Sequence, residues 1–120
     1  MKAEDLMIGD WVNMHGDNWR ATLATLQLAW DKPGTIKPIP ITTKILEKNG
    51  ILYEKQSFYY IIEDVKDLEC TYYIQQVLQG DWVIGVDIGA YDCSVFARVK
   101  YVHQLQHALK LCGIDKEITL

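Results

Sequence analysis

Two histidines near the end of the chain have a spacing that could bind a metal ion. His103 and His107 stand four residues apart in the segment YVHQLQHALKLCGI, and Cys112 follows them. At this spacing two imidazoles lie on one face of a helix. In the zinc-hydrolase version of the motif a glutamate after the first histidine acts as the general base, but Gln104 occupies that position. Because an amide cannot accept a proton from metal-bound water, the hydrolytic motif lacks its base.

Helical geometry separates the cysteine from the histidines. At roughly 100° per residue, the apolar positions gather on one side, which holds Val102, Leu105, Ala108, Leu109 and Cys112. We predict an amphipathic helix from about Val102 to Cys112, ended by Gly113. Its outward, solvated face carries His103, His107 and Lys110. This face is a candidate binding surface, and we expect no metal or other cofactor on it.

A small metal-dependent hydrolase is the alternative use of these histidines. It requires a concave pocket in which His103 or His107 meets a carboxylate from elsewhere in the chain, such as Asp92 or Glu117.

The segment WVIGVDIGAYDCSVFARV, residues 82–99, resembles the first phosphate-binding hairpin of the actin, sugar-kinase and heat-shock ATPase superfamily. Asp87, Gly89 and Ser94 take the corresponding positions. That superfamily closes two large lobes over its nucleotide, and only a short segment follows Val99, so we expect no second lobe. The prediction is a β-hairpin with the turn IGAYDCS and no ATP binding.

The aromatic residues, which include four tryptophans and seven tyrosines, are expected to fill the core for the most part. Trp11 and Trp19 are the expected exceptions, because they flank the turn HGDN. Tryptophan beside a turn is a frequent binding residue, so the hairpin that carries Trp11 and Trp19 is the second candidate binding surface.

The composition is that of one globular domain, with 120 residues, 49% of them hydrophobic and 23% charged. The formal net charge of −4 removes the bulk attraction to phosphate backbones, so nucleic-acid binding would need a local basic cluster. Acidic residues are concentrated between 61 and 97, where Lys66 is the only basic residue. This stretch is either a solvated acidic face or a surface for a basic partner.

No apolar run is long enough to span a bilayer, and the start of the chain is acidic, so we expect a cytoplasmic protein without a membrane partner. Cys70, Cys93 and Cys112 are odd in number and widely spaced among apolar neighbours. This pattern indicates small buried side chains in a reducing compartment rather than disulfides.

The patterning predicts an α+β fold in a single domain of residues 1–120: a curved, mostly antiparallel sheet or partial SH3-like barrel, with one short and one longer C-terminal helix. Residues 1–41 form the SH3-like strand region, with a strand after Gly9-Asp10 and a second strand at RATLATLQLAW. A helix is the alternative for RATLATLQLAW, because alanine and leucine favour it.

The rest of the chain, 42–120, is predicted as helix, strands and the C-terminal helix. TIKPIPIT alternates but contains two prolines, so it is an edge strand or an extended connector. Thr42 caps a short helix over 42–49, and Gly50 ends it. An antiparallel meander follows from Ile51 to about Tyr101, with turns near 55–57 and at Gly80-Asp81, and KEITL can add a terminal strand.

Three segments, MIGDWV, PIPITTKILEKNG and YVHQLQHALKLCGIDKEITL, together resemble a family of short uncharacterised proteins of Bacteroides-type bacteria, their phages and mobile elements. The match covers about a third of the chain, in the same order. It implies an intracellular protein with an SH3-like first part, and it favours a binding or accessory role over an enzyme. We therefore expect a non-enzymatic interaction module with a protein partner, with nucleic-acid binding as a further alternative.

Overall fold

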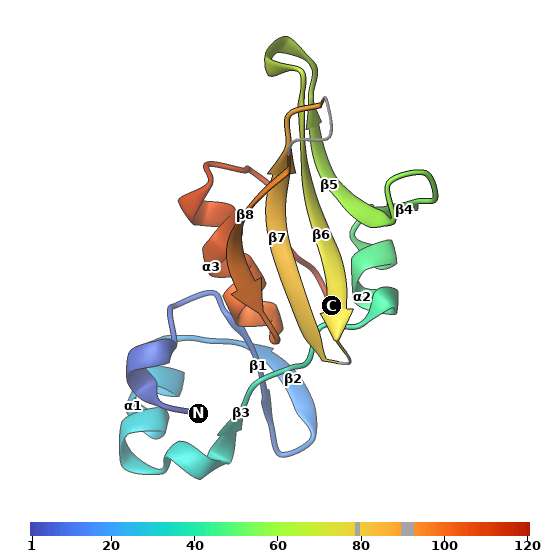
Figure 1. Ribbon diagram of the computed structural model, residues 1–120. Helices are drawn as coiled ribbons and strands as arrows, with labels where there is room; N and C mark the ends of the chain where they lie inside the picture. Colours follow the sequence, from blue (N-terminus) through green and yellow to red (C-terminus); the bar gives the residue numbers. More distant parts are fainter. Residues whose placement is uncertain (79, 90–92) are drawn as a thin grey trace.

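The structure is a computed structural model that describes residues 1–78, 80–89 and 93–120. In this part of the chain two antiparallel sheets and three α-helices form an α+β fold, as predicted (Figure 1). Neither sheet closes into a barrel, so the open, curved sheet is the form that the structure adopts.

The N-terminal unit contains a three-stranded sheet in the order β2-β1-β3, formed by β1 (Trp11–Met14), β2 (Asp17–Arg20) and β3 (Ile36–Lys37). The helix α1 (Leu23–Asp31) and the 3₁₀ turns η1 (Ala3–Asp5) and η2 (Pro33–Thr35) surround it. The HGDN turn is confirmed, since Met14 pairs with Asp17 across it. The unit has its own small core of Ala3, Leu6, Val12, Ala21, Ala29 and Ile36.

The predicted strand at RATLATLQLAW is wrong, and the helix alternative is correct. Thr22 and Thr25 form a capping box, in which each hydroxyl accepts the backbone N–H of the other residue (3.4 and 3.0 Å). This local bonding starts α1, and Thr25 and Ala29, four residues apart, are buried on one face. In the alternating pattern of this segment neither set of residues is purely polar, so the pattern is weak evidence for a strand. The helix propensity of its alanines and leucines prevails.

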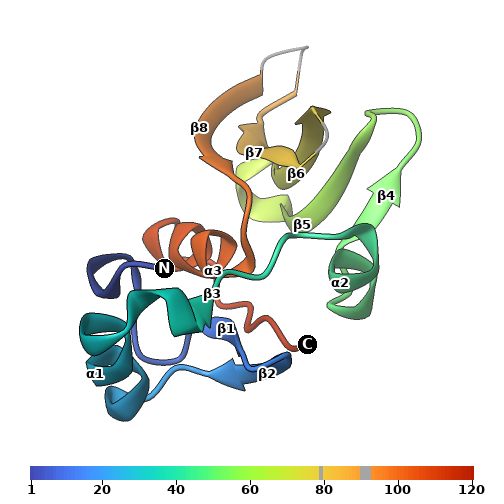
Figure 2. The same ribbon diagram turned by 90° about the horizontal axis from the view of Figure 1, so that it is seen from below.

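The main sheet is the predicted meander, in the order β4-β5-β6-β7-β8. Its strands are β4 (Leu52–Glu54), β5 (Tyr59–Val65), β6 (Cys70–Leu78), β7 (Asp81–Asp87) and β8 (Cys93–Val99), with the 3₁₀ turn η3 (Lys66–Leu68) after β5. Figure 2 shows that the strands curve together into an open arc. Part of the expected turn IGAYDCS, residues 90–92, lies outside the described residues.

Two helices and the C-terminal segment pack with this sheet around the main core. The short helix α2 (Thr43–Lys48) begins at Thr42, whose hydroxyl accepts the N–H of Ile45, as predicted. The helix α3 (Val102–Leu111) contributes its apolar side, as predicted. The main core contains Ile39, Ile41, Leu46, Ile51, Ile62, Ile74, Trp82, Ile84, Val99, Val102, Leu105, Ala108, Leu109, Ile114 and Ile118.

The Pro38 and Pro40 segment runs between the two units as an extended connector after the edge strand β3, with one isolated bridge from Pro40 to Tyr101. The predicted terminal strand at KEITL is wrong, because no strand follows α3 in the described residues. Side chains hold this segment instead: Asn49 bonds both the N–H (2.7 Å) and the carbonyl (2.9 Å) of Thr119.

Gly85 in β7 allows a tyrosine to lie against the backbone of the sheet. A Cβ at Gly85 would come 2.6 Å from the Tyr73 hydroxyl oxygen and 2.7 Å from the Ser94 carbonyl oxygen. The Tyr73 side chain is buried, so it has little room to move away.

We expect Gly85→Ala to lower the free energy of unfolding by about 1–3 kcal/mol, because the added methyl group overpacks this contact. Gly34→Ala is the matched control, since a Cβ at Gly34 meets nothing within 4 Å. Urea unfolding of both variants measures the difference, and equal stabilities would contradict the proposed steric role of Gly85.

Candidate functional site

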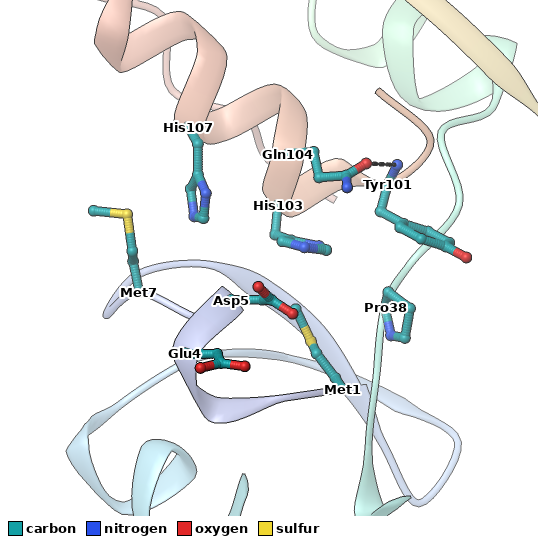
Figure 3. A pocket seen from close by; sticks show the side chains of 9 residues that line it. All are labelled: Met1, Glu4, Asp5, Met7, Pro38, Tyr101, His103, Gln104 and His107. Atoms are coloured by element: carbon teal, nitrogen blue, oxygen red, sulfur yellow. Dashed lines mark hydrogen bonds between the residues drawn. The ribbon is translucent and has the colours of Figure 1, made fainter. Parts of the chain in front are cut away.

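A groove of about 540 Å³ lies between the N-terminal segment and the first turns of α3 (Figure 3). The N-terminal wall includes the 3₁₀ turn η1, and the opposite wall is α3. The groove contains both histidines that the sequence singled out. Its lining consists of Met1, Glu4, Asp5, Met7, Pro38, Tyr101, His103, Gln104 and His107.

His107 is held in place by Asp10, a carboxylate with no solvent exposure (0%). The His107 Nε2 atom lies 2.9 and 2.8 Å from the two Asp10 oxygens. Because an ionised carboxylate only accepts hydrogen bonds, Nε2 donates in this contact. Asp10 also accepts the backbone N–H of Met7 at 2.7 Å. One carboxylate therefore fixes both walls of the groove.

His103 is the most unusual group in the groove, because it is 94% buried (6% exposed) and its Nδ1 atom has no hydrogen-bond partner in the described structure. Its ring stacks on Tyr101, with centroids 5.9 Å apart, and meets the His107 ring edge-on at 5.7 Å. Burial lowers the pKa of His103 below its ordinary value, and the His107 charge adds to this effect against the opposing charges of Asp10 and Asp5. His103 is therefore a neutral imidazole at pH 7.

The predicted outward face of α3 is thus wrong for the histidines. The N-terminal segment folds back across this face, and helical periodicity contains no information about such a distant segment. Lys110 is exposed, as predicted, but it lines a different and smaller groove of about 280 Å³. Gln104 has a structural role, because its Oε1 accepts the N–H groups of Lys100 and Tyr101 at the start of α3.

The Trp11–Trp19 hairpin is only partly the exposed surface that the sequence predicted. Trp19 is 52% exposed. Trp11 is half-buried: its Nε1 donates to the Ile118 carbonyl at 2.7 Å, and the Arg20 guanidinium lies 4.9 Å from its ring centroid. Trp30, expected in the core, is 71% exposed on α1, whose buried residues are Thr25 and Ala29.

The carboxylates named for the hydrolase alternative do not meet the histidines among the described residues. Glu117 pairs with Arg20 at 2.8 Å, and Asp92 lies outside the described residues. The carboxylate that does reach His107 is that of Asp10, for which the sequence predicts only a position directly before a strand. The described chain contains no group of three or more His, Cys, Asp or Glu side chains placed to hold a metal ion.

The three cysteines differ in their surroundings. Cys70 is buried, and Cys112 packs against the main core, where burial raises the pKa of its thiol. Cys93 is exposed, contrary to the expectation that all three are buried.

Comparison of the chain with protein-family models, curated proteins and solved structures finds no match. Within the described residues, no helix has the length and apolar character needed to cross a membrane.

We expect Asp10→Ala to lower the free energy of unfolding by about 3 kcal/mol, because it leaves the Met7 N–H and His107 Nε2 without an acceptor. Asp17→Ala is the control, since Asp17 is exposed in β2, and its effect should stay within about 0.5 kcal/mol. Chemical denaturation measures both. A similar loss in the two variants would show that Asp10 has no special structural role.

The stability of the protein should fall on mild acidification because of His103. Burial lowers the folded-state pKa below the unfolded value of 6.5, so the unfolded chain takes up the proton first. The contribution to stability is complete above pH 6.5 and is lost as the pH falls toward the lower, folded-state pKa. His103→Gln should flatten this decline between pH 8 and pH 5 in urea titrations, whereas His15→Gln, at an exposed position, should not.

Proposed function

We propose that the protein is a non-enzymatic interaction module, and that a protein partner binds in the groove beside α3. The unpartnered Nδ1 atom of His103 is the observation that carries this proposal. A buried polar atom without a hydrogen bond costs about 1–3 kcal/mol. A partner that supplies the missing hydrogen bond recovers part of this free energy.

The charges around the groove favour a basic side chain of the partner. Glu4 and Asp5 are exposed carboxylates on its wall, His103 is neutral, and the Met1 ammonium is bonded to the carbonyls of Pro33 and Ile36. With its proton on Nε2, neutral His103 has a buried hydrogen-bond acceptor at Nδ1, and a lysine ammonium or an arginine guanidinium is a donor of the kind that this atom lacks. Met1 and Met7 are flexible apolar side chains that can pack along the aliphatic part of such a residue.

The overall charge supports the same class of partner. A net charge of −4 attracts basic proteins and repels nucleic acid. The proposal also agrees with the intracellular accessory role, in the cytoplasm of a bacterium that hosts phages or mobile elements, that the sequence resemblance implies.

A peptide library with one varied central residue tests the choice of partner. Peptides with central lysine or arginine should bind in preference to peptides with central norleucine or glutamate, because only the basic residues pair with Glu4 and Asp5. Replacing both carboxylates, Glu4→Gln with Asp5→Asn, should remove this preference. The measurement is fluorescence anisotropy of labelled peptides at two salt concentrations.

Methionine methyl NMR locates the bound peptide, because the chain contains three methionines. Met1 and Met7 line the groove, whereas Met14 lies in β1 outside it. The preferred peptide should shift the methyl signals of Met1 and Met7 and leave Met14 unchanged. Unmoved Met1 and Met7 signals at saturation would place the peptide elsewhere and overturn the proposal.

A further inference from the structure

A second groove, of about 630 Å³, lies on the other side of the main sheet from α3. Tyr73 and Gln75 line it from β6, and they alternate with Ile74, which points into the main core beside α3. Successive residues of a strand point to opposite faces, so this groove and α3 are on opposite faces of the sheet. Its volume lies within the usual range of small-molecule pockets, about 300–1,000 Å³.

The floor of this second groove is a fixed network of two tyrosines and a carboxylate. The buried rings of Tyr59 and Tyr73 stack at a centroid distance of 4.6 Å. The Tyr59 hydroxyl donates to Asp87 Oδ2 at 2.8 Å, and the Gly89 N–H donates to Oδ1 at 2.9 Å. The hydrogen bond from Gly89, and after it the one from Tyr59, lower the pKa of Asp87. Burial raises the pKa values of Tyr59 and Tyr73. The network therefore holds an ionised carboxylate beside two neutral phenols.

No basic side chain balances the charge of Asp87 in the described structure. None of the groove-lining residues is a lysine, arginine or histidine, and no described ion pair includes Asp87. Asp64 lies at the same end of the sheet, since Thr71 in β6 pairs with Asp64 in β5 on one side and with Asp87 in β7 on the other. The local charge is therefore negative, which disfavours a phosphate or carboxylate ligand.

The neutral side chains that line this groove include several hydrogen-bond acceptors. The Gln75 amide nitrogen donates to the Phe58 carbonyl at 3.0 Å, which leaves its Oε1 oxygen as an acceptor. Ser57 and Gln56 add a hydroxyl and a second amide oxygen. A ligand that matches this set is positively charged and has several N–H groups to donate.

We propose that this groove binds a small organic cation of the amine or guanidine class. The ion pair with Asp87 supplies the charge recognition, and the N–H groups of the ligand donate to the oxygens of Gln75, Ser57 and Gln56. This proposal does not depend on the function proposed for the groove beside α3, since the two grooves share no lining residue.

Agmatine, which has one guanidinium and one ammonium group, is a suitable probe for the full-length protein. In ¹⁵N NMR titrations it should cause saturable shifts of the Gly85 and Gly89 amides. Tetramethylammonium, which has charge but no N–H donor, should bind at least about tenfold more weakly, because it cannot form the charge-assisted hydrogen bonds.

Asp87→Asn keeps the size of the side chain and an acceptor oxygen, so the ¹⁵N spectrum away from the groove should be unchanged. It should weaken agmatine binding at least about tenfold, which corresponds to the loss of one charged hydrogen bond. Asp64→Asn is the matched control. It removes an exposed charge at the same end of the sheet and outside the lining, so it should change binding no more than about twofold.

Two results would overturn the proposal. One is the absence of saturable shifts at Gly85 and Gly89 in the wild-type protein up to about 10 mM agmatine, a concentration that would detect even weak binding. The other is equal weakening by Asp64→Asn and Asp87→Asn, which would show general attraction to an acidic surface rather than a site.

Discussion

The burial of Asp10 is the constraint on which the arrangement of the two units depends. A carboxylate without solvent contact is stable only when polar groups satisfy it, and Asp10 obtains one of them from α3, 97 residues further along the chain. The neighbouring residues reinforce this contact. Gln106 accepts the N–H of Trp11 at 2.9 Å and donates to the carbonyl of Gly9 at 3.2 Å. Three consecutive residues of the N-terminal segment are thereby bonded to two side chains of one helix.

These polar contacts matter because the buried hydrophobic residues form two separate clusters, and from the three-stranded sheet Trp11 is the side chain that packs against the main core. Apolar burial stabilises each unit internally but is not directional, so it does not fix how the N-terminal segment lies along α3. Hydrogen bonds to a buried carboxylate and a buried amide do fix that geometry. The groove beside α3 is a consequence: the segment is bonded at Asp10, and the space toward the start of the helix, at His103, stays open.

The sequence was informative where the pattern is local. The meander, the cap at Thr42 and the apolar side of α3 all follow from residues close together in the chain, and the structure confirms them. At α1 the local signals conflict: the alternating pattern favours a strand, whereas Thr22 and Thr25, at the spacing of a capping box, favour the helix that forms. The predicted exposure of His103 is wrong for a different reason. No pattern within α3 can show that a segment about a hundred residues earlier covers one of its faces. Helical periodicity alone therefore predicts that both histidines are exposed.

The roles of the individual acidic residues also depend on contacts that the sequence does not show. The acidic excess between 61 and 97 predicts a negative surface without distinguishing its carboxylates from one another. In the structure Asp81 lies 3.4 Å from Lys100, and Asp64 is exposed and bonded to Thr71. Asp87 accepts hydrogen bonds from the Tyr59 hydroxyl and the Gly89 N–H.

Asp10 and Asp87 are held in a similar way, because each accepts hydrogen bonds from its own chain and neither is paired with a lysine or arginine among the described residues. The outcomes differ: Asp87 lines its groove, where its negative charge is accessible to a ligand, whereas Asp10 has no solvent exposure and its carboxylate bonds His107 and the Met7 N–H. In the groove beside α3 the accessible negative charge is therefore that of Glu4 and Asp5, which Asp10 helps to position by bonding the segment to the helix, and in the second groove it is that of Asp87.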